Sequence, residues 1–242
     1  MLKSGKSKVS FIIASLIFLA LNAMPVFSDP AYDDYVRAQR YIANGQMESA
    51  LSVLTRAINA EPKYLNAYIA RGFVYSRLGK TERALAEYDK VLSIAANNAV
   101  ALSNKGFCLY ELGRLEEALA VLNKAESLDP ERAEILVNRG QVYLILGQFQ
   151  KAVDDCSRAI AIEDSDADGY ITRADALVKL EKKKEALKDY SKAISLHPDP
   201  VHMFHKEGEA FYRRAMLYSS MGKKAAAARD LDTCESLGYK PN

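Results

Sequence analysis

The most suggestive chemistry in this chain is a run of regularly spaced carboxylates. Asp164, Asp166 and Asp168 stand at alternate positions. Gly169 comes next, and Asp175 closes the run at its twelfth position. Calcium binds six to eight oxygen ligands, and its loops need a glycine at the sharp turn. These four aspartates are therefore candidate calcium ligands.

The same segment also fits a structural role. It resembles the calcium loop of EF-hand proteins, but the glutamate usual at the twelfth position is replaced by Asp175, and the chain has no second such loop. In the alternative interpretation, the segment is a linker whose aspartates cap the next helix, because carboxylates are favoured at helix N-termini. We favour the linker, and a calcium-dependent binding module using residues 164–175 is the alternative function.

The remaining reactive residues predict no catalysis. His197, His202 and His205 are the only histidines, and they fall within nine residues of one another. A serine or cysteine nucleophile elsewhere would lack a histidine base, and no glycine-rich loop could hold a phosphate. Three cysteines on helical positions are expected to be buried free thiols rather than a disulfide framework. We expect no enzyme activity and no cofactor.

The N-terminus has the pattern of a secretory signal. Lys3, Lys6 and Lys8 precede a short apolar run, and a small residue, Ser28, follows it. This order is typical of a signal peptide over residues 1–28, and we favour cleavage after Ser28. The alternative is an uncleaved membrane anchor over residues 9–27. An exported protein, periplasmic or secreted, is the expected location in the first case.

The charge balance excludes a nucleic-acid partner. The chain has 33 basic and 31 acidic residues. Without residues 1–28, which hold three lysines and no acid, the balance is 30 to 31. A protein that binds nucleic acid usually carries a basic face, and none is indicated here.

The chain beyond this signal is a tandem repeat. Gly72, Gly106 and Gly140 are 34 residues apart, and Ala84, Ala118 and Ala152 follow them with the same period. A period of this length predicts repeated helix-turn-helix units, in which small residues let two helices approach closely. Extending the register gives six units within a domain over residues 29–242, at 31–64, 65–98, 99–132, 133–166, 167–200 and 208–241.

The pattern closely resembles the tetratricopeptide repeat family, although no unit has the family's tryptophan. The resemblance implies an all-α fold, an α-solenoid that forms a right-handed superhelix. It also implies a protein scaffold that binds a peptide or a partner helix in its concave groove, as an adaptor or assembly factor. From helical spacing, the groove-facing residues are Tyr35, Gln39, Ile69, Phe73, Arg77, Asn104, Phe107, Asn138, Gln141 and Tyr212.

A basic residue precedes the small position in every unit. The second helix supplies an acid 16 residues later in four units, as with Arg71 and Glu87 or Arg139 and Asp155. A row of cations could bind a ligand, but ion pairs between the two helices explain both columns. We interpret the row as structural.

The sixth unit departs from the simple period. Gly208 lies 34 residues after Ala174, yet the turn at Gly222 and the alanine at Ala227 place Ala215 in the small position. Seven residues, 201–207, are then an insertion, which we expect to extend a helix from about Pro200 beyond the stack. No capping helix follows the sixth unit, so its end is a possible oligomer contact.

Overall fold

The structure, a computed structural model, describes residues 29–196 and 204–240. Over these residues it has twelve helices and no strand. The first helices of the six repeats are α2 (Pro30–Ala43), α4 (Leu65–Arg77), α6 (Ala99–Glu111), α8 (Ala133–Ile145), α10 (Ala167–Lys179) and α12 (Phe204–Ser220). The second helices are α3 (Met47–Ala60), α5 (Thr81–Ile94), α7 (Leu115–Leu128), α9 (Phe149–Ile162), α11 (Lys183–Ser195) and α13 (Lys224–Ser236). The prediction of an all-α solenoid of about six helix pairs is confirmed.

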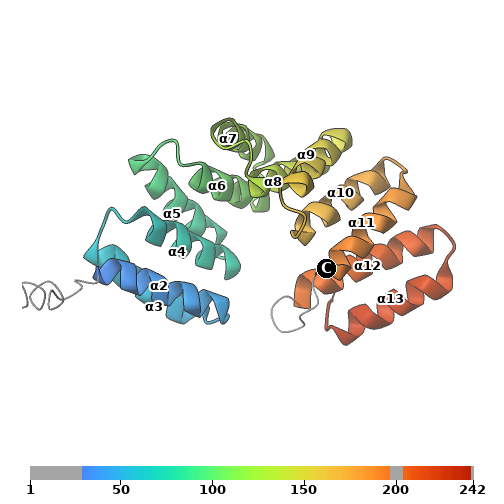
Figure 1. The fold of residues 1–242 in the computed structure, drawn as a ribbon, viewed down its shortest axis with the longest axis horizontal. Coiled ribbons are helices and arrows are strands. Elements are labelled where there is room, and N and C mark those ends of the chain that lie inside the picture. The colour runs from blue at the N-terminus through green and yellow to red at the C-terminus, as the bar shows by residue number, and fades with distance from the viewer. Residues whose placement is uncertain (1–28, 197–203, 241–242) are drawn as a thin grey trace, which may run out of the picture.

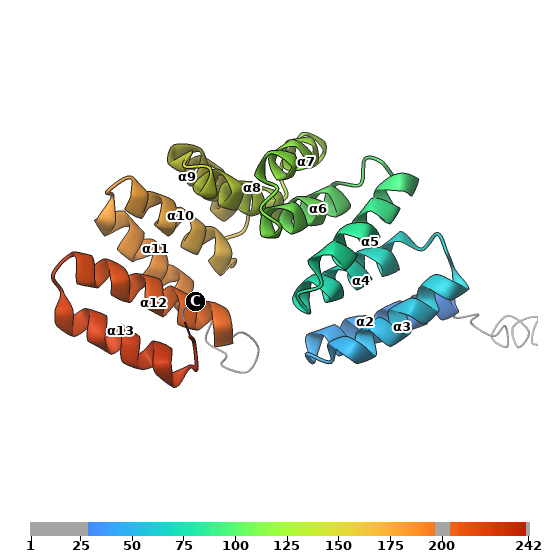
Figure 2. The same cartoon turned by 180° about the vertical axis from the view of Figure 1, so that it is seen from behind.

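The pairs form a curved row in which each packs on the next (Figure 1). Helices α4, α6 and α8 lie on the inner side of the arch, and α5, α7 and α9 lie on the outer side, as the reverse view also shows (Figure 2). First helices of neighbouring repeats contact one another from α2 to α10. The concave face is therefore built from first helices.

The expected signal segment, residues 1–28, lies outside the described residues, and so do residues 197–203 of the linker before the sixth repeat. None of the helices in the described ranges is long and apolar enough to cross a membrane.

Close helix approach at the small positions shapes each repeat. A methyl group on Gly106 would lie 2.5 Å from Cγ of Leu122, and one on Gly72 would lie 2.8 Å from the Tyr88 ring. Leu122 and Tyr88 are almost fully buried. The glycines thus admit large side chains from the second helix, and these side chains fill the core between the helices.

The turns inside the repeats depend on left-handed backbone. Gly79, Gly113 and Gly147 follow their first helices at φ of 68°, 73° and 72°. Glycine adopts this conformation without a steric cost, which is why it ends many helices. In the fifth repeat Glu181 takes the same place at φ 60°, a conformation that L residues rarely adopt.

The structure gives Gly208, which matches the 34-residue period but does not take the small position, a packing role of its own. Ala215 is fully buried, as expected of the small position. A methyl group on Gly208 would lie 2.3 Å from Cβ of Tyr239, which also stacks near Tyr212 at 6.0 Å between ring centroids. Gly208 therefore accommodates a ring that returns from beyond α13, a contact the sequence did not reveal.

Helix α12 begins at Phe204, inside the 201–207 insertion, and has 17 residues where the other first helices have 13 or 14. The described part of the insertion therefore lengthens the helix, as expected. Its predicted start at Pro200 lies outside the described residues. Leu231, which occupies the position of the buried Tyr190 one repeat earlier, is 37% exposed. The positions in α5 that face the next repeat, Leu85 and Tyr88, are covered by that repeat, and no described helix covers Leu231 in this way.

We expect Gly106→Ala to lower the free energy of unfolding by about 1–3 kcal/mol, the usual cost of overpacking a core. In a Leu122→Ala background the same change should be neutral or stabilising, because the methyl group then has room and alanine favours the helix by about 1 kcal/mol. Urea unfolding of the four proteins measures the coupling. An equal cost in both backgrounds would show that the Leu122 contact is not the cause.

Candidate functional site

A continuous groove runs along the N-terminal half of the concave face. Two cavities of about 550 and 430 Å³ share Phe73, Asn104 and Glu134, so they join into one surface from α2 to α10. We call this surface the N-terminal groove. Its lining includes the predicted residues Tyr35, Gln39, Ile69, Phe73, Arg77, Asn104, Phe107 and Asn138.

Exposed rings and amides dominate the middle of the N-terminal groove. Phe73 is 41% exposed, and Phe107 is half-buried beside Tyr110, with 6.2 Å between the ring centroids. Asn138 is buried and donates a hydrogen bond from Nδ2 to Oγ of Ser103 at 3.0 Å, which links α8 to α6. Rings offer contact area to a bound chain, and an amide such as Asn104 can bond its backbone.

Gln141 is the one predicted groove residue that lines none of the described cavities. It occupies the position that Phe73 and Phe107 take in the preceding repeats, but it is half-buried. Its Oε1 atom is buried without a hydrogen-bond partner among the described residues. Gln141 marks the boundary between the two halves of the concave face.

A third cavity, of about 690 Å³, lies between α8, α10 and α12, and we call it the C-terminal groove. Tyr212, the last of the predicted residues, lines it. Ile145 and Met216 also line it and are 58% and 40% exposed. The prediction of the groove omitted Ile145, although the sequence distinguishes it as an apolar residue at a position that is charged in the repeats around it. The equivalent residues in neighbouring repeats are the charged Arg77, Glu111 and Lys179.

The charges in the C-terminal groove are paired with one another. Arg213 donates to Asp175 from Nη1 at 2.5 Å and to Glu209 from Nε at 2.9 Å. The Tyr190 hydroxyl donates to the other oxygen of Asp175 at 2.5 Å. Burial raises the pKa of the Asp175 carboxyl, although Arg213 and Tyr190 oppose this effect. Two side chains thus hold the half-buried Asp175 carboxyl in place, and Glu209 in turn holds Arg213.

The calcium alternative fails on geometry. Helix α10 begins at Ala167, with Asp166 as its N-cap, and the Asp166 side chain accepts from the backbone N–H of Asp168 at 3.0 Å. Asp175 lies seven residues further along the same helix, about 10 Å away by helical rise. It therefore cannot close a loop around an ion held by Asp164 and Asp166. The linker interpretation, with an aspartate capping the next helix, is confirmed.

The row of basic residues is used for structure, as expected. Arg71, Arg139, Arg173 and Arg214 each form a two-pronged ion pair with the acid 16 residues later, namely Glu87, Asp155, Asp189 and Asp230. Such paired geometry is the strong form of an arginine–carboxylate contact. These guanidinium groups are therefore not available to a ligand.

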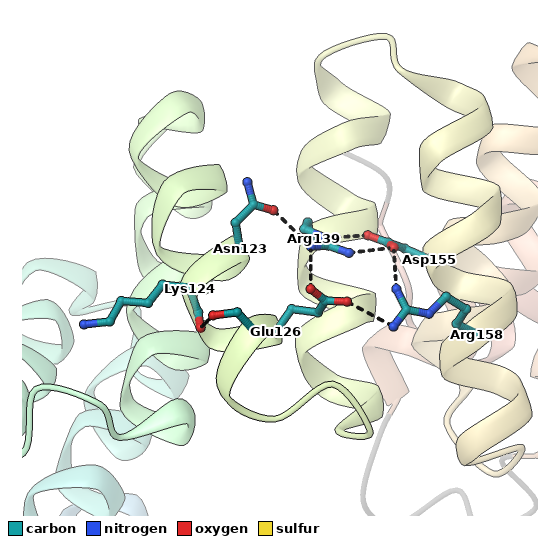
Figure 3. Close-up of polar contacts among 7 residues, drawn as sticks. Asn123, Lys124, Glu126, Arg139, Asp155 and Arg158 are labelled. Atoms are coloured by element: carbon teal, nitrogen blue, oxygen red, sulfur yellow. Dashed lines mark hydrogen bonds and ion pairs between the residues drawn. The ribbon is translucent and has the colours of Figure 1, made fainter.

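Each of these arginines also reaches back to the preceding repeat. Arg139 donates from Nη1 to Oδ1 of Asn123 on α7 at 2.9 Å, while its other nitrogens hold Asp155 on α9 (Figure 3). Glu126 and Arg158 complete the cluster, with 3.0 Å between them. Arg71, Arg173 and Arg214 make the same backward bond to Thr55, Ser157 and Ser191. This second half of the pattern was not predicted.

Lys105, like Arg37, departs from this pattern. The residue 16 positions after Lys105 is Val121, so the equivalent ion pair within the repeat cannot form. Lys105 pairs instead with Asp89 of the preceding repeat at 2.6 Å. An ion pair thus joins the third repeat to the second, but no two-pronged arginine pair of the kind described above joins its own two helices.

The fold and the concave face define an all-helical repeat scaffold. Tetratricopeptide repeat sequence models match residues 41–99, 133–166, 167–200 and 208–237, and a further TPR repeat model matches residues 108–147. The chain belongs to the tetratricopeptide repeat family. This fold is a known type of non-enzymatic scaffold, and it supports a role in protein–protein interaction. No curated protein matches the chain.

Solved structures share the fold at low sequence identity. A tetratricopeptide repeat protein from Parabacteroides merdae is 24% identical with a TM-score of 0.62, and the match covers 89% of this chain and 82% of the other. PilF of Pseudomonas aeruginosa is 23% identical with a TM-score of 0.67, and the match covers 86% of this chain and 92% of PilF. PilW, described as a widely conserved type IV pilus biogenesis factor, is 19% identical with a TM-score of 0.72, and the match covers 86% of this chain and 94% of PilW. At these identities the likeness establishes the fold.

We expect Asp155→Ala to lower the free energy of unfolding by about 3 kcal/mol, because it leaves the buried Arg139 guanidinium without its carboxylate. The matched control is Glu117→Ala, which breaks the exposed pair with Arg114 and should cost less than about 0.5 kcal/mol. Urea unfolding monitored by circular dichroism measures both. Equal losses would mean that the buried pair contributes no more than a surface one.

Proposed function

We propose that this protein is an exported scaffold that binds a peptide or a partner helix along its concave face and acts as an adaptor or assembly factor. One observation carries the proposal. The N-terminal groove is continuous across several repeats, and it presents Phe73 with 41% of its surface exposed. A large apolar ring exposed in a groove is typical of a binding surface rather than of a core.

The basic residues of the row support this assignment by their absence from the groove. Four of the six basic residues in the row form ion pairs with carboxylates on the second helix of their repeat. The groove-facing positions are instead rings, aliphatic side chains, amides and a few acids, with Arg77 as the one cation in the lining. The protein thus separates the residues that hold the stack together from those that face a partner.

Phe73→Ala combined with Phe107→Ala should abolish capture of the partner, with a loss of about 1 kcal/mol or less of stability per change. Ile94→Ala is the matched control, because Ile94 is 43% exposed at the end of α5 and lines none of the described cavities. Affinity capture followed by mass spectrometry measures binding, and thermal unfolding measures stability. Undiminished capture by the double variant would exclude the groove as the binding surface.

Export is inferred from the first 28 residues alone. The basic start and short apolar run favour a cleaved signal, and the alternative is an anchor over residues 9–27. In a double-membraned bacterium we expect a periplasmic protein whose first residue is Asp29. N-terminal sequencing of the fractionated protein tests this. An intact Met1 in the membrane fraction would support the anchor, and an intact chain in the cytoplasm would contradict export.

A further inference from the structure

The two grooves of the concave face differ in whether their carboxylates have a cationic partner. In the C-terminal groove, Arg213 pairs with both Asp175 and Glu209, so those acids are neutralised from within the protein. Among the acids that line the N-terminal groove, Glu111 and Glu134 have no ion pair within the described residues, and the lining holds a single cation, Arg77. The N-terminal groove therefore has an excess of negative charge.

Glu134 is at the centre of this excess. It lines both of the cavities that form the groove. Within residues 29–196 and 204–240 it has no hydrogen bond and no ion pair. Surrounding protein atoms raise the pKa of the Glu134 carboxyl, and the positive charge of Arg132 opposes this shift. The Glu134 side chain is exposed to solvent within the groove. An exposed carboxylate without a cation of its own attracts a positive group that enters from outside.

Glu111, which lines the second of these cavities together with Glu134, is exposed and is also weakly compensated. It accepts one hydrogen bond, from the Thr81 hydroxyl at 3.2 Å. Surrounding protein atoms raise the pKa of the Glu111 carboxyl, and that hydrogen bond opposes the shift. Arg77 lines the same cavity but pairs with neither Glu111 nor Glu134 within 4.0 Å. The groove thus offers a second carboxylate without a cation beside it.

The rings between these acids define what kind of cation fits. Phe73 lies in both cavities with Glu134, and Phe107 lines the second one. Lysine and arginine lay their aliphatic stems along apolar surface while the charged end reaches a polar group. A cation over an aromatic face gains further attraction. A strongly acidic chain, such as a nucleic acid, would be repelled.

We propose, building on the function proposed above, that the N-terminal groove binds a peptide segment in which a lysine or arginine is flanked by apolar side chains. The cationic group lies against Glu134, and the apolar side chains pack on Phe73 and Phe107. The C-terminal groove, whose acids are already paired, contributes apolar contact without this charge preference.

The test begins with random dodecapeptides displayed on phage and selected on the full-length chain. We expect the selected sequences to be enriched in lysine or arginine next to apolar residues. One enriched peptide is then synthesised with a fluorescent label, together with a matched peptide in which glutamine replaces its cationic residue. Fluorescence anisotropy gives the affinity of both peptides for each protein variant.

Glu134→Gln should weaken the cationic peptide on the order of tenfold and leave the glutamine peptide within about twofold. The matched control is Glu116→Gln. Glu116 is also the second residue of its helix, α7, but it is exposed away from the groove. This control should leave both affinities unchanged. The effect of Glu134→Gln should also shrink as salt is raised, because screening weakens the attraction.

The outcomes separate this proposal from the one on which it rests. Enrichment of acidic or uncharged peptides, or an equal effect of Glu134→Gln on both peptides, would overturn the charge preference while Phe73→Ala still weakens both. Selected peptides that respond to Met216→Ala but not to Phe73→Ala would place binding in the C-terminal groove and also overturn it. If no peptide is selected, both proposals fail.

Discussion

The distance between the two helices of each repeat is the constraint on which the rest of this structure depends. A second-helix side chain, Tyr88 or Leu122, occupies the space that a methyl group on Gly72 or Gly106 would need. With the helices at this separation, the arginine next to the glycine can reach an acid on the second helix with both prongs. The first helices can then line one face side by side, and the groove follows from their outward positions.

On one first helix, the arginine that braces the stack and the acid that lines the groove occupy different faces. On α8, Arg139 points to α9 and α7, while Glu134 and Asn138 line the groove. A change on one face can therefore alter a partner without loosening the stack. The same division explains why the acids behave differently. Asp155 has two arginines within 4.0 Å, whereas Glu134 has none.

Much of this arrangement could be predicted from the sequence, because it repeats. The 34-residue period predicted the helix pairs, and the 16-residue spacing from Arg71 to Glu87 predicted the ion pairs. What does not repeat was missed. Tyr239 packs on Gly208 through a contact that occurs once, and the exposure of Leu231 depends on a missing neighbour rather than on its own residue type. The charge preference of the groove was also missed, since it depends on whether each acid has a partner, as Asp175 does and Glu134 does not.

The backward bonds of the arginines bear on how the array unfolds. The stability of a repeat array is approximately a sum of terms internal to each repeat and terms at each interface. Arg139 contributes to both, because it braces α8 to α9 and also holds Asn123 of the preceding repeat. Opening one such repeat therefore removes support from its neighbour, which makes the array more cooperative. Lys105 makes its ion pair across an interface, with Asp89. The third repeat is consequently tied to its neighbours while its own two helices lack the two-pronged arginine pair, so its internal packing is where this support is weakest.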